Sequence, residues 1–428
     1  MMADFPSPRL RLFLLAYRAA WVLLLPVVLV YLRLRARKDP LYAHHLPERF
    51  GHSQGLDGAV WIHVVSVGEV RAAAPLIRAL LERGERVVLT HFTPAGRREA
   101  QALFSAPIAA GTLHSVWVPF ELSGAFRRFF RLYRPAYGLV IEVEIWPVMI
   151  MEARRAGVPL FMANAIFPAR SFARDRDGLR GEIMRGFAGA MVKSEVQRDR
   201  FAAVGLSNIA VTGELRFDLP PPVGQVQAGL RARAALAPAH GVLAFASIVE
   251  GEDALMIDTI KALPPDRRPL IVYVPRAPER FDAVAGLLAG AGLRVAWRSL
   301  AFDTALAPRD LPDCDVLLGD SLGEMFFYLA MADRVVVGGG FVRGSHNIIE
   351  PLSLGKPVIV GPDITTIEYP AAEAIEAGVC RQVQTGAELI SALSEPVSSA
   401  DTTAFLAAHA GAVARTLDAL PRLLATSR

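Results

Sequence analysis

The sequence has little cysteine and lacks several motifs that mark well-known enzyme classes. Only Cys314 and Cys380 occur among its 428 residues, too few for a disulfide framework or a cysteine-type zinc site. His-Glu-x-x-His, a P-loop ending in Lys-Ser/Thr and a Gly-x-Ser-x-Gly elbow are all absent. His44 and His45 are adjacent, which does not suit a metal site. These absences argue against a zinc protease, a P-loop nucleotide hydrolase and an α/β-type serine hydrolase.

Long polar tracts and internal repeats are missing too, so neither large-scale disorder nor a repeat architecture is expected. With 428 residues, of which 53% are hydrophobic, the chain can form two or three domains with full cores. The formal net charge of +4 favours anionic partners. Charge alone does not distinguish nucleic acid, anionic lipid and a charged sugar.

An apolar segment from Leu12 to Leu32 is interrupted by Arg18 and Pro26. A span of roughly 20 apolar residues can cross a bilayer, but this one can equally lie along the interface. The alternative is a buried helix of a soluble domain. No small-residue cleavage site follows, so a cleaved signal peptide fits poorly. Residues 1–38 are predicted to be an anchor that holds a cytoplasmic body at the inner leaflet, because positive charge is heavier on its C-terminal side: Arg33, Arg35, Arg37 and Lys38 against Arg9 and Arg11.

After the anchor, short apolar runs alternate with helical stretches such as Val70–Arg83 and Arg97–Phe104, which predicts open parallel sheets of the α/β class. The predicted strands are Trp61–Val67, Val87–Phe92, Val116–Phe120, Gly138–Ile145, Pro159–Ala163, Gly189–Lys193 and Ile209–Gly213, then Val242–Ser247, Leu270–Val274, Leu293–Trp297, Val316–Leu318, Arg334–Val337 and Pro357–Val360. Pro220, Pro221 and Pro222 indicate a linker. The predicted boundaries are 39–216 for an N-terminal Rossmann-like domain, 217–240 for the linker, and 241–428 for a second such domain with closing helices. Ligands are expected in a cleft between the two domains, at the carboxyl ends of the strands.

The stretch Val335–Pro351 is predicted to form a buried strand, a glycine-rich turn and a helix that carries Asn347 and Glu350 on one face. Gly338 to Gly340 would let backbone N–H groups approach an anion, and the helix N-terminus would favour negative charge. The alternative is a tight turn with a capping asparagine and no ligand, since a lone glycine motif is weak.

Three further polar clusters follow strands of the second domain: Ser247–Asp253, Pro275 with Arg276, and Gly319–Glu324. Arg276 would neutralise a phosphate, and Gly323 beside Glu324 would hold a base or sugar. Each cluster alone is more often a helix cap or a surface salt bridge. Together with the glycine-rich turn they predict a nucleotide site.

In the first domain, polar clusters follow the strands at Ser66–Glu69, Thr90–Gly96, Glu142–Trp146 and Gly213–Asp218. Glu142 and Glu144 are expected to share a strand face, where burial is costly unless they are paired or functional. The alternative is that they cap the next helix or pair with Arg154 and Arg155. Glu48 lies between anchor and cleft, where a carboxylate would take a proton from a lipid-borne hydroxyl. One helix carries a basic group that fits either a membrane-facing surface or a solvated face: Arg127, Arg128, Arg131 and Arg134.

These clusters, in this order, resemble the 3-deoxy-D-manno-octulosonic acid (Kdo) transferase family of lipopolysaccharide assembly. The matching runs span roughly residues 40 to 365: Glu48–Gly51, Trp61–Glu69, Thr90–Gly96, Glu142–Pro147, Gly213–Asp218, Pro275–Phe281 and His346–Pro351. The N-terminal segment looks like that family's membrane anchor.

The resemblance implies a GT-B glycosyltransferase that inverts the anomeric centre without a metal or other cofactor. It implies a CMP-Kdo donor, a lipid A-type acceptor and the cytoplasmic face of a bacterial inner membrane, with no nucleic-acid partner. By the same resemblance Glu48 is the general base. The implied donor contacts are Pro275, Arg276, Gly323, Glu324, Met325, Asn347, Ile348, Ile349 and Glu350. The acceptor side is assigned to Ser66, Gly68, Glu69, Glu142 and Arg216, the last in the place of a family lysine.

Four departures from the family pattern concern the site. Ser247-Ile-Val-Glu250 replaces a Ser-Thr-His sequence, and Pro275-Arg-Ala-Pro278 replaces Pro-Arg-His-Pro, so that two histidines are lost. Ile166 stands in place of an arginine, and Ser345 in place of a glycine. Fewer charge-assisted hydrogen bonds would then reach an anionic sugar. The alternatives are therefore a divergent paralogue with another nucleotide sugar, a nucleotide-sugar epimerase on the same scaffold, and an inactive membrane-docked binding protein.

Overall fold

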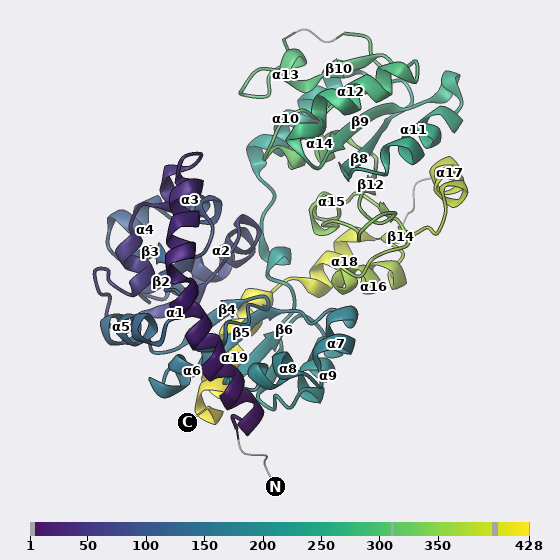
Figure 1. Cartoon of the computed structure of the whole chain (residues 1–428). Coiled ribbons are helices and arrows are strands. Elements are labelled where there is room, and N and C mark those ends of the chain that lie inside the picture. The colour runs from purple at the N-terminus through teal and green to yellow at the C-terminus, as the bar shows by residue number, and fades with distance from the viewer. Residues whose placement is uncertain (1–4, 310–311, 396–400, 428) are drawn as a thin grey trace. The chain divides into compact units, whose positions relative to one another are not determined.

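The computed structural model describes residues 5–309, 312–395 and 401–427, and the chain divides into two compact units. Unit 1 comprises Met1–Leu219 with Gly411–Arg428, and unit 2 comprises Pro220–Ala410. Each unit contains one sheet of seven strands with helices on both faces (Figure 1). The α/β class with two Rossmann-like sheets is thus confirmed.

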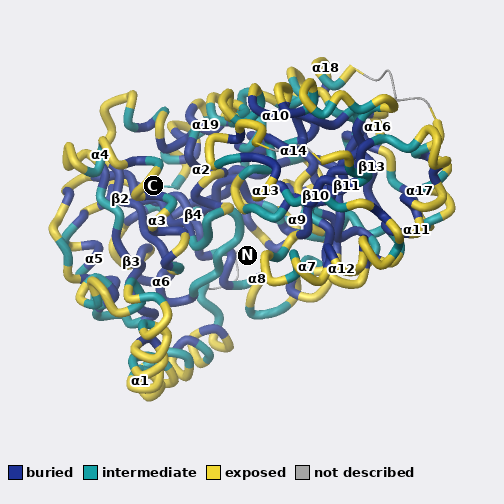
Figure 2. The backbone as a smooth tube through the Cα atoms, turned by 90° about the horizontal axis from the view of Figure 1, so that it is seen from above, coloured by how far each residue is buried: buried dark blue, intermediate teal, exposed yellow. Residues whose placement is uncertain are grey.

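All strands of unit 1 are parallel and follow the order β3-β2-β1-β4-β5-β6-β7. Their bounds are Val60–His63 (β1), Val87–His91 (β2), Leu113–Trp117 (β3), Gly138–Ile141 (β4), Leu160–Ala165 (β5), Gly189–Val192 (β6) and Ile209–Val211 (β7). Neighbouring side chains of β1 enter opposite cores, because successive strand residues point to opposite faces. Trp61 packs with helices of one face and Ile62 with those of the other. The central strands are therefore fully buried, as Figure 2 shows in dark blue.

Helices cover both faces of this sheet. One core includes residues of α1 (Pro8–Ala36), α5 (Ser123–Tyr133), α6 (Pro147–Arg155), α8 (Leu179–Met184) and α9 (Glu195–Ala203). The other includes residues of α2 (Val67–Glu82), α3 (Pro94–Leu103) and α19 (Ala412–Thr426). The remaining helical elements are α4 (Ser105–Ala109), α7 (Ala169–Asp175), η1 (Pro40–Tyr42), η2 (Leu46–Phe50) and η3 (Leu215–Asp218).

The sheet of unit 2 is also all parallel, in the order β10-β11-β9-β8-β12-β13-β14. Its strands are β8 (Val242–Ile248), β9 (Leu270–Pro275), β10 (Val295–Trp297), β11 (Val316–Leu318), β12 (Arg334–Val337), β13 (Val358–Val360) and β14 (Cys380–Gln382). Its helical elements are α10 (Val223–Leu236), α11 (Asp253–Ala262), η4 (Pro265–Arg267), η5 (Pro278–Arg280), α12 (Phe281–Gly290), α13 (Arg298–Ala301), α14 (Met325–Met331), α15 (Ile349–Ser353), α16 (Glu368–Glu376), α17 (Gly386–Ser394) and α18 (Thr402–His409).

The predicted domain boundaries need two corrections. The expected linker 217–240 contains α10, because its prolines, Pro220 to Pro222 and Pro238, lie outside Val223–Leu236, which can form a helix that packs on α14. The closing helices were assigned to the second domain, but α19 belongs to unit 1. The Asp218 carboxylate holds its start, accepting hydrogen bonds from the backbone N–H groups of Gly411 (2.6 Å) and Val413 (2.7 Å).

Two strand predictions also need correction. The predicted strand Val116–Phe120 lies three residues too far along the chain. The observed strand β3 is Leu113–Trp117, and the residues after Trp117 leave the sheet. β14 was not predicted; it is a short edge strand whose Arg381 is exposed. The other predicted strands coincide with observed ones to within a few residues.

Candidate functional site

The glycine-rich turn after β12 surrounds a carboxylate of the protein itself. Glu252 is fully buried, and its two oxygens accept hydrogen bonds from the Gly339 N–H at 2.9 and 2.7 Å. The N–H groups of Phe341 (3.1 Å) and Val249 (3.2 Å) complete this set of backbone donors. Two of the amides that lie in the turn are therefore occupied by Glu252. This cluster, Val249, Glu252, Gly339 and Phe341, is called the Glu252 nest below.

The turn requires glycine for conformational and steric reasons. Gly339 has φ +95°, a region that side chains disfavour, and a Cβ there would lie 2.2 Å from the Gly344 carbonyl oxygen. The chain thus doubles back on itself tightly, and the same turn that holds Glu252 positions the residues that follow it.

The helix predicted for Asn347 and Glu350 begins later than expected. α15 starts at Ile349, so Asn347 precedes it, and the Asn347 Oδ1 accepts a hydrogen bond from the Ile349 N–H at 2.9 Å. Asn347 thus closes a turn one residue before Ile348, the N-cap of the helix, and the expected helical face shared with Glu350 is wrong. The side chain of Asn347 is exposed, Glu350 is half-buried, and Ile348 and Ile349 are buried. An asparagine that caps a turn leaves its amide N–H₂ available to a ligand.

The Gly323–Met325 turn leads from β11 into α14. Gly323 has φ +80°, and its carbonyl oxygen accepts a hydrogen bond from Gln225 Nε2 at 2.8 Å. The Glu324 carboxylate accepts from Arg298 Nη2 at 2.6 Å and from the Ser321 hydroxyl. Arg298 is itself buried, so Glu324 is held as one member of an ion pair.

A cationic group lies beyond β9 and β12. Pro275 ends β9, the Arg276 N–H donates to the Ile248 carbonyl at 2.8 Å, and the Arg276 side chain is exposed. Burial, then Arg276 and Arg343, lower the pKa of His346 to about 4. Because β11, β9, β8 and β12 are consecutive in the sheet, the four predicted clusters of unit 2 lie at neighbouring strand ends. An exposed pair of arginines beside these ends favours an anionic ligand.

In unit 1, Glu48 lies in η2 and is held by a buried arginine. The Glu48 carboxylate accepts hydrogen bonds from Arg97 Nη1 (2.7 Å) and Nη2 (3.1 Å) and from the Trp117 N–H (2.8 Å). The exposed His45 also lies beside this carboxylate, with its Nδ1 3.8 Å from the Glu48 Oε1. Arg97 is 3% exposed and also donates to the Ser115 carbonyl at 3.0 Å, which fixes the pair against β3.

The residue after Glu48 is Arg49, and its guanidinium is buried among aromatic rings. It lies 4.3 Å from the Trp117 ring centroid and 5.6 Å from that of Phe120. Burial, then Arg97, lower the pKa of Arg49 to about 10. Gly51 closes the turn at φ +80°, where a Cβ would approach the Ala125 carbonyl oxygen to 2.2 Å. These contacts fix the Glu48–Gly51 run to the body of unit 1.

Ser66, Gly68 and Glu69 form the start of α2. Ser66 is the N-cap: its Oγ accepts from the Glu69 N–H and donates to the Glu69 carboxylate, which also accepts from the Val65 N–H at 2.7 Å. This is a helix-capping arrangement. Burial raises the pKa of Glu69 to about 7 in spite of these hydrogen bonds.

The half-buried Glu142 and Arg216 belong to an ionic cluster at the carboxyl ends of neighbouring strands. Arg216 donates to Glu142 (2.9 Å) and to Glu214 (3.2 Å), and Lys193 Nζ lies 2.6 Å from Glu214. Asn164 Nδ2 donates to Glu214 at 2.9 Å. Glu142, Asn164, Lys193, Glu214 and Arg216 are called the Glu214 cluster below. Lys193 and Arg216 lower the pKa of the fully buried Glu214 to about 2, against the effect of burial.

The expectation that Glu142 and Glu144 share a strand face is wrong, because β4 ends at Ile141 and Glu142 adopts φ +61°. Glu144 accepts from Trp146 Nε1 at 2.8 Å. The alternative partners are wrong too: Arg155 pairs with Glu152, and Arg154 donates to the Gly186 carbonyl.

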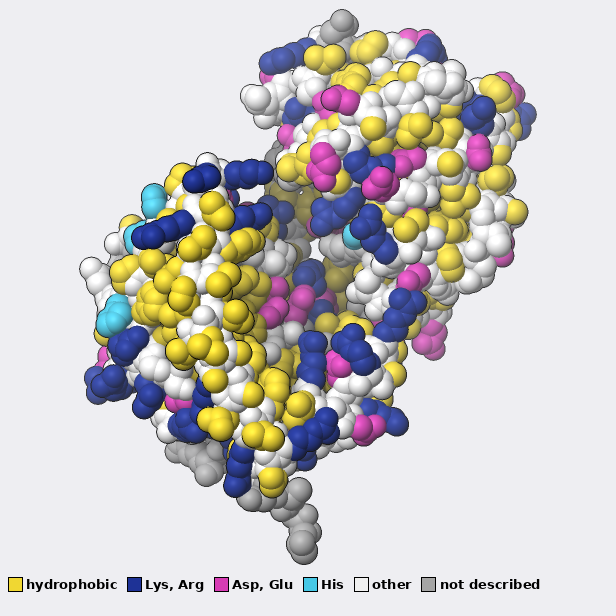
Figure 3. Space-filling model, viewed as in Figure 1, with side chains coloured by type: hydrophobic (Ala, Val, Ile, Leu, Met, Phe, Trp, Pro, Cys, Tyr) yellow, Lys and Arg dark blue, Asp and Glu magenta, His cyan; other side chains and the backbone are white. Residues whose placement is uncertain are grey.

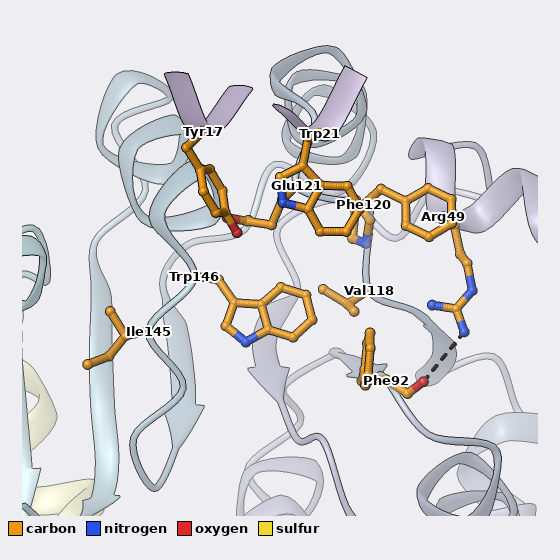
Figure 4. A pocket seen from close by; sticks show the side chains of 10 residues that line it. Tyr17, Trp21, Arg49, Phe92, Val118, Phe120, Glu121, Ile145 and Trp146 are labelled. Atoms are coloured by element: carbon orange, nitrogen blue, oxygen red, sulfur yellow. Dashed lines mark hydrogen bonds between the residues drawn. The ribbon is translucent and has the colours of Figure 1, made fainter. Parts of the chain in front are cut away.

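A pocket of about 240 Å³ lies in unit 1 between α1 and the ends of β2, β3 and β4 (Figure 4). Its walls are mostly aromatic and apolar, with Arg49 and Glu121 as charged members. Glu121 accepts from the N–H groups of Val148 (2.8 Å) and Met149 (2.9 Å), at the start of α6. Burial raises its pKa to about 7. The lining is Tyr17, Trp21, Arg49, Phe92, Val118, Pro119, Phe120, Glu121, Ile145 and Trp146.

Sequence reasoning missed the partners Arg97 and Lys193, and it placed Glu214 and Glu252 in polar clusters without assigning either a role of its own. Lys193 and Glu214 carried a usable signal, because each is charged and stands at or just after the end of an apolar strand run. Arg97 sits inside an ordinary helix and gave none. Within residues 5–309, 312–395 and 401–427, no group of three His, Cys, Asp or Glu residues is placed to hold a metal ion. Metal independence stays a prediction.

Comparison with known proteins gives relatives along nearly the whole chain. The family model described as "3-Deoxy-D-manno-octulosonic-acid transferase (kdotransferase)" matches residues 44–219. A 3-deoxy-D-manno-octulosonic acid transferase of Bordetella pertussis is 41% identical over 93% of this chain and 96% of the relative. One of Haemophilus influenzae is 29% identical, with 83% of each chain covered.

Among solved structures, a putative UDP-N-acetylglucosamine 2-epimerase from Listeria monocytogenes matches with a TM-score of 0.59 and 16% identity, covering 85% of this chain and 96% of that one. At this identity the likeness shows the fold alone.

Proposed function

The chain belongs to the 3-deoxy-D-manno-octulosonic acid (Kdo) transferase family, and on that premise we propose that it moves Kdo, or a closely related acidic sugar, from a CMP-activated donor to a lipid A-type acceptor. It is a glycosyltransferase of the GT-B type. The observation that carries the proposal is the 41% identity to a named Kdo transferase across both units. In this proposal, the transfer of Kdo takes place at the cytoplasmic face of the inner membrane.

Unit 2 takes the donor in this proposal. Arg276 faces the phosphate, because it is exposed at the end of β9 next to Arg343 and half-buried His346. The Gly323–Met325 turn and the segment Asn347–Glu350 contact the cytidine and ribose. The neighbouring strand ends of β11, β9, β8 and β12 support this assignment. The Glu252 nest positions the turn and does not itself contact the donor, since its amides are occupied.

Glu48 is the proposed general base. It takes the proton of the acceptor hydroxyl, the freed oxygen pair forms the new bond to the anomeric carbon, and the bond from that carbon to the phosphate oxygen breaks. CMP leaves with that electron pair, and attack from the opposite face inverts the centre. Arg97 and the Trp117 N–H hold the Glu48 carboxylate in place, and this fixed orientation supports a role in accepting the proton. Unit 1 binds the acceptor sugar near Ser66, Gly68, Glu69, Glu142 and Arg216.

The test is in vitro transfer from labelled CMP-Kdo to a lipid A precursor. Glu48→Gln is expected to lower kcat by about 10²–10⁴-fold, the usual contribution of a general base, while CMP still stabilises the protein against heat. The matched control is Glu82→Gln, at the C-terminal end of α2 in the same unit, which should leave transfer unchanged. Normal turnover by Glu48→Gln would remove Glu48 from the mechanism.

The transfer assay and the thermal stabilisation by nucleotides together separate the alternatives. Stabilisation by UDP in place of CMP would favour another donor or an epimerase. Stabilisation by CMP with no transfer to any lipid acceptor would favour an inactive binding protein.

A further inference from the structure

Helix α1 has two apolar faces with different surroundings. One face lies along unit 1, and its buried or half-buried residues recur every three or four positions from one end of the helix to the other: Leu10, Leu14, Tyr17, Trp21, Leu25, Val28 and Leu32. This spacing is that of a single stripe on an α-helix. The stripe is buried near both ends, at Leu10, Leu14 and Leu32, and half-buried between them, where Tyr17 and Trp21 line the pocket.

Specific contacts attach this inner face at several points. At the N-terminal end the Ser7 N–H and hydroxyl donate to Glu182 at 2.9 and 3.0 Å. Arg18 Nη2 lies 3.3 Å from the Glu152 carboxylate, which is 1% exposed. The Trp21 and Phe120 rings are 6.1 Å apart. Beyond the inner face, the exposed Arg35 donates to the hydroxyl of Tyr42 in η1 at 3.0 Å, a local contact that fixes how the chain leaves the helix.

The outer face is apolar as well, and within unit 1 it is exposed. Its large side chains are Leu12, Leu15, Val22, Leu23, Leu24, Val27, Val30, Tyr31 and Leu34, each at least half exposed. Figure 3 shows α1 as a band of hydrophobic side chains across unit 1, with Lys and Arg side chains gathered near it. Arg9 and Arg11 precede the band, and Arg33, Arg35, Arg37 and Lys38 end it. An apolar strip bordered by cations complements an anionic lipid surface.

We propose that α1 does not cross the bilayer but lies in the plane of one leaflet, with its outer face in lipid and its inner face on unit 1. The proposal rests on the membrane association stated above and specifies its geometry. A helix of 29 residues that spanned the bilayer would either pull unit 1 into the hydrocarbon or detach from it. Detachment would place Arg18 in lipid and leave the buried Glu152 with Arg155 as its remaining ion-pair partner. In the plane of the leaflet, Arg18 keeps Glu152 and faces no lipid.

The first test asks on which side of the membrane the two ends of α1 lie. In a variant without native thiols (Cys314→Ser, Cys380→Ala), single cysteines are introduced as Asp4→Cys and Lys38→Cys. Intact spheroplasts are then treated with a membrane-impermeant maleimide. For a helix in the plane, both cysteines stay unlabelled until the membrane is opened, and then both react. Labelling of Asp4→Cys alone in intact spheroplasts would show a spanning helix and overturn the proposal.

The second test measures depth with a fluorophore on single cysteines and lipids brominated at defined carbons. Val27→Cys and Val28→Cys form a matched pair, because the side chains are identical and adjacent but the first is exposed and the second half-buried. The brominated lipids are expected to quench the fluorophore strongly in Val27→Cys and weakly in Val28→Cys. Leu15→Cys, Val22→Cys and Val30→Cys should share one shallow depth, roughly 5–10 Å.

The outcomes separate two failures. A profile deepest at Val22 and shallow at Leu15 and Val30 would indicate a spanning helix and would overturn the geometry while membrane association stands. No quenching at any position would reject membrane association itself. Circular dichroism and the transfer assay show whether each variant is folded and active.

Discussion

Two buried carboxylates, one in each unit, are satisfied by different partners. Glu214 of unit 1 is paired with the side chains of Lys193 and Arg216, which carry full charges. Glu252 of unit 2 is held by backbone N–H groups of a glycine turn. Charged partners balance the carboxylate's charge, whereas amides donate only dipoles, but amides are fixed by the chain and lose no side-chain freedom on folding. The Glu214 cluster is therefore the site where losing one member costs most.

Removing the Glu214 carboxylate should produce the largest effect on stability. Glu214→Ala leaves Lys193 buried without its 2.6 Å partner, and breaking a buried pair in this way typically costs about 3–5 kcal/mol. Urea unfolding measures this in a Trp297→Phe background, where the other four tryptophans, all in unit 1, report on that unit alone.

The matched control for this prediction is Glu195→Ala, which removes an exposed glutamate that pairs with Arg198 on the surface of the same unit. Such pairs contribute about 0–1 kcal/mol. A loss in Glu214→Ala no larger than in this control would show that the cluster is not a stabilising ion network.

The corresponding change in unit 2 should cost less. Glu252→Gln keeps the side-chain shape but turns one acceptor into a donor that faces the Gly339 and Phe341 N–H groups, with an expected loss of about 2–3 kcal/mol. Hydrogen exchange of residues 338–346 measures the opening of the turn. Each 1.4 kcal/mol lowers protection about tenfold where exchange proceeds through this opening.

Glu250→Gln is a suitable control for the Glu252 change, because it makes the same substitution at an exposed glutamate two residues earlier in the chain. If Glu252→Gln left protection at Gly339 and Phe341 as high as in this control, the nest would be unimportant for the turn.

Acid should act on unit 1 through the Glu214 cluster. The folded pKa of Glu214 is lowered to about 2 from 4.5, so its contribution is present above pH 4.5 and is lost as pH falls towards 2. About 2 kcal/mol is expected to disappear over this window, since one pKa unit corresponds to 1.36 kcal/mol and coupling within the cluster shares the effect. Glu214→Gln should flatten the pH dependence of unfolding in this window, and an unchanged slope would contradict the prediction.

The smallest effect concerns Glu69, whose pKa is shifted in the opposite direction. Burial raises its pKa from 4.5 to about 7. Its protonated form is therefore favoured in the folded state, and the free energy of unfolding of unit 1 falls as pH rises from 4.5 to about 7. The full shift corresponds to roughly 3 kcal/mol, of which about 1 kcal/mol is expected after a discount for solvent screening and relaxation around the carboxyl. Glu69→Gln should remove this loss, because the glutamine cannot ionise. The same pH series of urea unfolding tests it, and a variant that keeps the full slope would assign the slope to another group, such as Glu121.

Much of the fold could be predicted because parallel strands buried on both faces are continuous apolar runs. The failures have physical causes. β3 was misplaced because Leu113-His-Ser-Val-Trp117 is interrupted by polar residues, while the apolar run just after it, Val118 to Phe120, lines the pocket beneath α1. β14 is short and polar. The return of α19 to unit 1 depends on contacts between residues nearly 200 positions apart, for which a single sequence carries no local signal.

The site was predictable at the level of strand ends but not of partners. The clusters after β9, β11 and β12 could be placed because polar residues following apolar strands gather at one edge of a parallel sheet. That Glu252 occupies the glycine turn, and that Arg97 holds Glu48, depend on side-chain geometry across elements. The roles of Glu48, Arg276, Asn347 and Glu350 stay predictions for the transfer assay.

The passage of the chain through unit 2 before α19 sets an order of events during synthesis. Unit 2 is an insertion into unit 1, entered at Pro220 and left at Ala410. All of unit 2 can emerge from the ribosome and fold while unit 1 still lacks α19, which covers one face of its sheet together with α2 and α3. A chain that stops after Ala410 would therefore keep an intact second unit and damage the first, and a nascent chain would need its exposed sheet face protected until translation ends.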